Sequence, residues 1–114
     1  MPTRYYIRLP DPARARGDDP ELAFHSQGAA GFAEELQDAL RNDVLFQRWR
    51  ARQDDPDEID PSMGATDPAA TVTGTQDDLH VGLEVVTVLP SGLLRQRLSL
   101  LAGHGWELRD VAAA

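Results

Sequence analysis

The three histidines are the side chains with the broadest chemistry in this chain, because histidine can change charge near neutral pH and can bind a metal. His25 falls in an expected loop, and His104 lies between two glycines, which predicts a turn. His80 and Glu84 share one face of an expected strand. A rise of about 3.3 Å per residue separates them by about 13 Å, too far to chelate one ion. We therefore expect no metal site and no cofactor.

Other catalytic patterns are weak. The acidic stretch 54–60 lacks the central glycine and the distal glutamate of a calcium-binding EF-hand loop. The glycines do not have the spacing of a phosphate-binding loop. No serine lies in a motif typical of a nucleophile, and Ser91 is better explained as a helix cap. No catalytic residue is predicted, which favours a non-enzymatic protein over an enzyme.

Charge is distributed unevenly. The net charge is −8 and there is no cysteine, which excludes disulfides and thiolate metal sites. The segment 53–68 carries six carboxylates, without which the rest of the chain has a charge of only −2: Asp54, Asp55, Asp57, Glu58, Asp60 and Asp67. Such a surface repels nucleic acid and favours a basic partner protein. The simpler interpretation is a solvated loop, and we expect this acidic linker to be mobile.

The stretch 48–52, Arg-Trp-Arg-Ala-Arg, is the one basic and aromatic cluster. It fits the last turn of a helix, with Trp49 on the core and the arginines near the negative end of the helix dipole. Contact with nucleic acid is the first alternative. Pairing with the acidic segment that follows is the second.

Hydrophobic periodicity predicts the elements that hold these residues within a single domain, 1–114. The expected strands cover 4–9, 70–75, 79–89 and 106–111. The expected helices cover 29–50 and 92–102, separated by a loop at 10–28 and the linker at 53–68. Asn42 and Asp43 prefer caps to helix interiors, so the first helix either kinks there or gives way to a second short helix.

The order β-α-β-β-α-β predicts an α+β fold, a ferredoxin-like sandwich in which both helices cover one face of a four-stranded antiparallel sheet. Right-handed crossovers place the first and third strands in the centre. Alternation along the strands defines a covered face: Tyr5, Ile7, Leu9, Val72, Leu83, Val85, Trp106 and Leu108. The opposite, bare face presents Arg4, Tyr6, Arg8, Thr71, Thr73, His80, Glu84, Val86, Val88, Glu107 and Arg109.

The bare face is where we expect a function. RNA-recognition domains share this element order, but they need stacking aromatics on the central strands, and the third strand offers none here. A small ligand would use Tyr6, Arg8, His80 and Glu84. Two apolar residues on this face, Val86 and Val88, predict a cover at one end. The loop around Leu22 and Phe24 or a second copy of the chain would supply it.

Two function classes follow. The first is a non-enzymatic interaction or regulatory module whose acidic surface engages a basic partner protein, with a homodimer as a further expectation. The second is a small-molecule-binding or enzymatic domain with a pocket between the bare face and the loop 11–28. A deep pocket with converging polar groups favours the second. The N-terminus has no apolar segment typical of a signal peptide, and we expect a cytoplasmic protein that contacts no membrane.

Overall fold

The computed structural model describes residues 1–114 as one four-stranded antiparallel sheet with three α-helices. The strands are β1 (Thr3–Leu9), β2 (Thr71–Asp77), β3 (His80–Thr87) and β4 (Glu107–Ala113). Their order across the sheet is β2-β3-β1-β4. The first and third strands are therefore central, as the crossover rule predicts, and the α+β class is confirmed.

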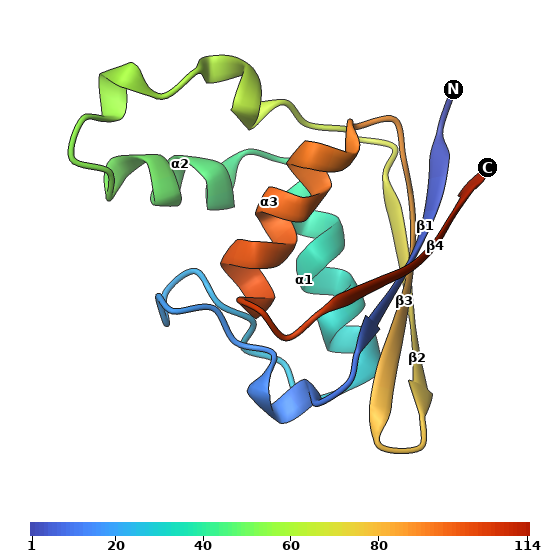
Figure 1. The fold of residues 1–114 in the computed structure, drawn as a ribbon. Coiled ribbons are helices and arrows are strands. Elements are labelled where there is room, and N and C mark those ends of the chain that lie inside the picture. Colours follow the sequence, from blue (N-terminus) through green and yellow to red (C-terminus); the bar gives the residue numbers. More distant parts are fainter.

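The helices are α1 (Ala29–Arg41), α2 (Val44–Ala51) and α3 (Ser91–Ala102). All of them lie on one side of the sheet, with α1 and α3 nearest to the strands and α2 farther out (Figure 1). Three short 3-10 turns complete the regular structure: η1 (Pro12–Arg14), η2 (Pro56–Glu58) and η3 (Pro61–Gly64). The other side of the sheet carries no element of the chain (Figure 1).

The core lies between the sheet and the helices, and strand alternation predicts its members well. Six of the eight expected covered-face residues are buried, and Trp106 and Leu108 pack half-buried against the same core. Every residue expected on the bare face is half-buried or exposed. On α1 the stripe Phe32, Leu36, Ala39 and Leu40 is buried against the sheet.

The break expected at Asn42 and Asp43 is confirmed, and it takes the form of a second short helix: α1 ends at Arg41 and α2 begins at Val44, where Asn42 Oδ1 accepts from the Val44 amide. Two other local expectations are wrong. Ser91 is the first residue of α3 and makes no cap, because Pro90 occupies that position. Leu79 is not part of β3. It lies in the two-residue β2–β3 turn after Asp78, which adopts φ 58°, and is 82% exposed.

Strand β4 contains a bulge that the sequence does not indicate. Its register against β1 shifts between Tyr6, which pairs with Asp110, and Ile7, which pairs with Leu108, so Arg109 is the extra residue. Simple alternation would turn Asp110 toward the helices. The bulge instead brings both Arg109 and Asp110 to the bare face, in keeping with the tendency of bulges to redirect side chains.

The loop 10–28 packs on the helical side. Leu22 and Phe24 are buried, and the Phe24 ring meets Phe32 edge-on with centroids 4.9 Å apart. The amides of Gly17 and Phe24 both donate to the Leu101 carbonyl at the end of α3. The expectation that this loop covers Val86 and Val88 is therefore wrong, because its apolar residues complete the main core instead.

Asp67 is a buried carboxylate at the end of the acidic segment, 6% exposed. It accepts from Thr87 Oγ at 2.8 Å, from the Val88 amide at 3.0 Å and from the Ala69 amide at 3.0 Å. Burial acts to raise the pKa of Asp67, but these donors and the charge of Arg41 outweigh it and hold the pKa below its usual value. Asp67 therefore differs from the solvated carboxylates expected around it and joins the segment to the end of β3.

Arg97 is the largest fully buried side chain, and it has no carboxylate partner. Its Nη2 donates to the carbonyls of Met63 (3.0 Å) and Ala65 (3.2 Å), and its guanidinium lies 5.5 Å from the Phe46 ring centroid. Burial lowers the pKa of Arg97. The guanidinium of Arg97, in the middle of α3, thus hydrogen-bonds to one carbonyl of η3 and one just after it, and holds that turn against α2.

None of the three α-helices combines the length and apolar character that a membrane crossing requires.

We predict that Asp67→Asn lowers the free energy of unfolding at neutral pH by about 1–3 kcal/mol, because an amide cannot accept all three hydrogen bonds as an anion does. The lowered pKa of Asp67 gives stability that is present above the unfolded-state value, about 3.9, and is lost as the pH falls through the folded-state value. Urea unfolding across this range should therefore show the difference from wild type shrinking in acid.

Asp54→Asn is the matched control, since Asp54 is exposed in the same segment and accepts no hydrogen bond. Equal unfolding midpoints for the two variants at neutral pH would contradict the role given to Asp67.

Candidate functional sites

The bare face of the sheet contains a hollow of about 360 Å³, which we call the sheet-face hollow. The four residues expected to bind a ligand all line it: Tyr6, Arg8, His80 and Glu84. Arg109 and Asp77 complete its polar wall. Gly82 supplies part of the floor, because a Cβ there would meet nothing closer than the Thr75 carbonyl at 3.9 Å. The absence of a side chain on central strand β3 thus leaves space between polar neighbours.

A chain of polar contacts crosses one end of the hollow. Arg8 Nη2 lies 3.4 Å from His80 Nδ1, and His80 Nε2 lies 3.1 Å from Asp77 Oδ2. Arg8 can only donate, so the neutral imidazole that fits both contacts accepts at Nδ1 and donates from Nε2 to Asp77. His80 is thereby oriented by a carboxylate on one side and a guanidinium on the other.

Arg8 is the uncompensated charge of the hollow. Arg4 lies 3.9 Å from Glu84, and Arg109 lies 3.9 Å from Glu107. Arg8 has no carboxylate oxygen within 4.0 Å, although its register partner on β4 is Glu107. Its Nε is also buried without a hydrogen-bond partner. A half-buried guanidinium with free donors can bind a carboxylate.

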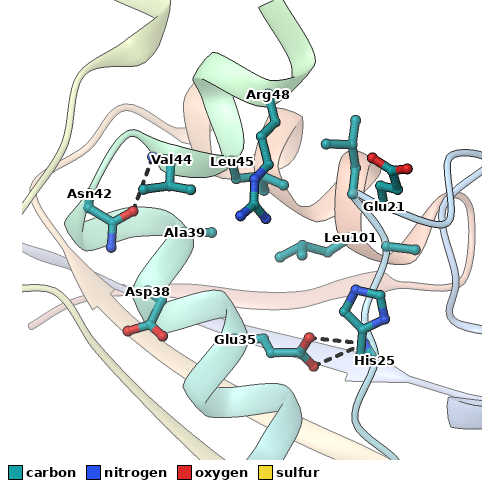
Figure 2. Close-up of a pocket in the computed structure, with 12 residues that line it drawn as sticks. Glu21, His25, Glu35, Asp38, Ala39, Asn42, Val44, Leu45, Arg48 and Leu101 are labelled. Carbon is teal, nitrogen blue, oxygen red and sulfur yellow. Dashed lines mark hydrogen bonds between the residues drawn. The ribbon is translucent and has the colours of Figure 1, made fainter. Parts of the chain in front are cut away.

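A second cavity, the helix-side pocket, lies between α1, α2 and the loop 10–28 and has a volume of about 270 Å³. Buried apolar side chains form its floor: Leu22, Ala39, Leu45 and Leu101. Figure 2 shows Arg48 extending from α2 into this space, with Glu35 and Asp38 along α1 and His25 on the loop. The pocket adjoins the covered side of the fold, whereas the sheet-face hollow lies on the bare side.

Glu35 builds one wall of the helix-side pocket. Its carboxylate accepts from the backbone amide of His25 at 2.9 Å (Figure 2) and from that of Ser26 at 3.0 Å. The loop is thereby held against α1. On the opposite side Arg52 pairs with Asp19 at 2.7 Å and with Glu21, which ties the same loop to the end of α2.

The sequence did not predict this pocket. Its polar residues come from three segments, and their proximity depends on the path of an irregular loop that has no periodic signal. The break at Asn42-Asp43 is the one local clue, because a second helix turning away from α1 opens an angle between the two. The pocket expected between the bare face and the loop 11–28 does not exist, since the loop lies on the other side.

The residues of the basic cluster 48–52 make different structural contacts. Trp49 packs partly buried against the core and lies 5.8 Å from the Phe46 ring. Arg50 donates to the Pro56 carbonyl at 2.9 Å and lies 4.0 Å from Asp57. The helix-end interpretation and the pairing with the acidic segment are both confirmed. Arg48 alone makes no such contact.

No group of three or more His, Cys, Asp or Glu side chains converges closely enough to hold a metal ion. Comparison of the chain with protein-family models, with curated proteins and with solved structures finds no match. The two cavities and the exposed charges are therefore the features of this chain that bear on its function.

Val86 and Val88 remain without a cover from their own chain, and Val88 is 57% exposed. A homodimer through this end of the bare face stays a prediction. If two copies meet there, light scattering after size exclusion should give twice the mass of the chain, and Val88→Asp should restore the monomer. A monomer at high concentration would contradict it, and Val44→Asp, a change at an exposed valine on α2, is the control.

Proposed function

We propose that this protein is a non-enzymatic binding module that holds a small carboxylate ligand in the sheet-face hollow. The observation that carries the proposal is Arg8, a half-buried guanidinium that lines the hollow and has no anionic partner in a chain of net charge −8. Acidic side chains are abundant here, yet none neutralises Arg8. A ligand carboxylate would satisfy the donors that the chain leaves free.

The other lining residues have supporting parts in this proposal. Tyr6 offers a hydroxyl and a ring beside Arg8, and His80 is held in place by Asp77. Glu84 repels an anion less strongly because Arg4 lies next to it. A cavity of about 360 Å³ is near the lower limit of known small-molecule sites, which favours a ligand of few atoms.

We also propose that the fold is of the ferredoxin-like kind, with α2 as an addition. The strand order β2-β3-β1-β4, the antiparallel pairing throughout and the helices on one face support it. A sheet with one bare face is a suitable platform for a binding site, because each central strand, β1 and β3, is held by one neighbouring strand on each side.

A second candidate function is docking of a basic partner protein on the acidic segment. Its support is that Asp54, Asp55 and Glu58 are exposed and that Asp57, with a side chain 99% exposed, makes only the 4.0 Å contact with Arg50. These carboxylates are free to attract cationic side chains over a range set by the salt concentration.

To test the first function, we expect acetate, benzoate or succinate to shift the amide resonances of Gly82 and its neighbours in a titration at constant ionic strength. Arg8→Gln should weaken binding by about tenfold or more, because a charge-assisted hydrogen bond is lost. Gly82→Val should block binding by filling the floor, since a Cβ there meets nothing closer than 3.9 Å and a β-branched residue suits a central strand; an unchanged unfolding temperature would verify that the fold is kept.

Arg14→Gln and Gly92→Val are the matched controls, since Arg14 is exposed outside the hollow and Gly92 has no atom within 4 Å of an added Cβ. Binding that survives both Arg8→Gln and Gly82→Val, or no binding of any of these carboxylates, would refute the proposed function.

The second candidate predicts that an oligolysine peptide binds the chain at low salt and dissociates as the salt concentration rises. A variant with Asp54, Asp55, Asp57 and Glu58 changed to the corresponding amides should bind about tenfold less tightly or worse. Fluorescence anisotropy of the labelled peptide measures this. Changing Asp11, Asp18, Asp77 and Asp78 to asparagine removes the same charge elsewhere, and equal loss in both variants would exclude a dedicated docking segment.

A further inference from the structure

Two charged residues at the exposed rim of the helix-side pocket, Arg48 and Asp38, have no partner within the protein. Most of the other polar groups in the lining already have partners. Glu35 accepts hydrogen bonds from the amides of His25 and Ser26, and Glu21 pairs with Arg52. Asn42 Oδ1 accepts from the Val44 amide. The guanidinium of Arg48 and the carboxylate of Asp38 make neither a hydrogen bond nor an ion pair. The lining thus has one free cation and one free anion.

These two groups come from different elements. Arg48 projects from α2 into the space above the floor, and Asp38 lies on α1 (Figure 2). They do not neutralise each other, since no ion pair within 4.0 Å joins them. Below them the floor is apolar and buried. A ligand that matches this lining offers an anionic group for Arg48, a cationic group for Asp38 and an apolar body for the floor.

We propose that the helix-side pocket binds a free α-amino acid with an aliphatic side chain, independently of the sheet-face hollow. The ligand carboxylate pairs with Arg48, its ammonium group pairs with Asp38, and its side chain lies against Ala39, Leu45 and Leu101. The volume of about 270 Å³ is below the range of drug-sized sites, about 300–1,000 Å³, and suits a molecule of this size.

The surrounding charges favour a zwitterion over either ion alone. Glu21, Glu35 and Asp38 would repel a simple carboxylate, and Arg48 would repel a simple amine. A peptide terminus carries only one of the two charges, so it would pair with either Arg48 or Asp38 and leave the other without a partner. His25, on the loop wall, is the remaining titratable side chain that faces this space.

The experiment compares three probes that share one carbon skeleton: L-leucine, 4-methylpentanoate without the amine, and 3-methylbutylamine without the carboxylate. L-leucine should shift the amide resonances of Ala39, Leu45 and Leu101, and each analogue should bind at least about tenfold more weakly because one charge-assisted contact is missing. Arg48→Gln and Asp38→Asn should each weaken L-leucine binding by a similar factor.

Arg14→Gln and Glu34→Gln are the controls, because both residues are exposed and neither lines the pocket. Arg48 and Asp38 are exposed and make neither a hydrogen bond nor an ion pair, so their substitution should leave the unfolding temperature nearly unchanged, which the same samples can verify. Equal binding of the three probes, shifts confined to Gly82 and the bare face, or no effect of Arg48→Gln would each overturn the proposal. None of these outcomes decides whether acetate binds at Arg8.

Discussion

The structure depends on one constraint: all helices and the long loop lie on the same face of the sheet. Because side chains alternate along β1 and β3, this one-sided layer sorts each strand into a core row and an exposed row. Ile7, Leu83 and Val85 become core, while Arg8, Gly82 and Glu84 become the wall and floor of the sheet-face hollow. The same sorting that stabilises the domain therefore creates its candidate site.

Composition does not reveal the contacts that anchor the acidic segment. Six carboxylates and three prolines suggest a chain that cannot order itself, and the exposed Asp54 and Glu58 fit that description. Contacts from outside the segment act on it, however. Asp67 accepts donors from Thr87 and Val88, and Arg97 donates to two of its carbonyls. These anchors come from residues 20 to 34 positions away, and no local pattern reveals them.

Periodicity predicted the four strands, the apolar stripe of α1 and the members of both sheet faces. The spacing of apolar residues, every second residue in a strand and every 3.6 residues in a helix, can be read directly from the sequence. Periodicity failed where a single residue changes the register of a strand or the direction of the chain. The bulge at Arg109 reverses the alternation beyond it, and the two-residue turn at Asp78 removes Leu79 from β3. The loop 10–28 has no period at all, so the helix-side pocket that it closes could not be foreseen.

The distribution of arginines links the two cavities. Most arginines have a partner in the chain: Arg16, Arg41, Arg50 and Arg97 donate to backbone carbonyls, Arg4, Arg14, Arg52 and Arg109 lie near carboxylates, and Arg95 lies over the Trp106 ring. Two remain, Arg8 with only an imidazole as partner and Arg48 with none. Because the chain has more carboxylates than guanidinium groups, electrostatic attraction favours a carboxylate partner for each arginine, and Arg8 and Arg48 have none. Each of the two lines a cavity, so the same free donors define both proposed sites.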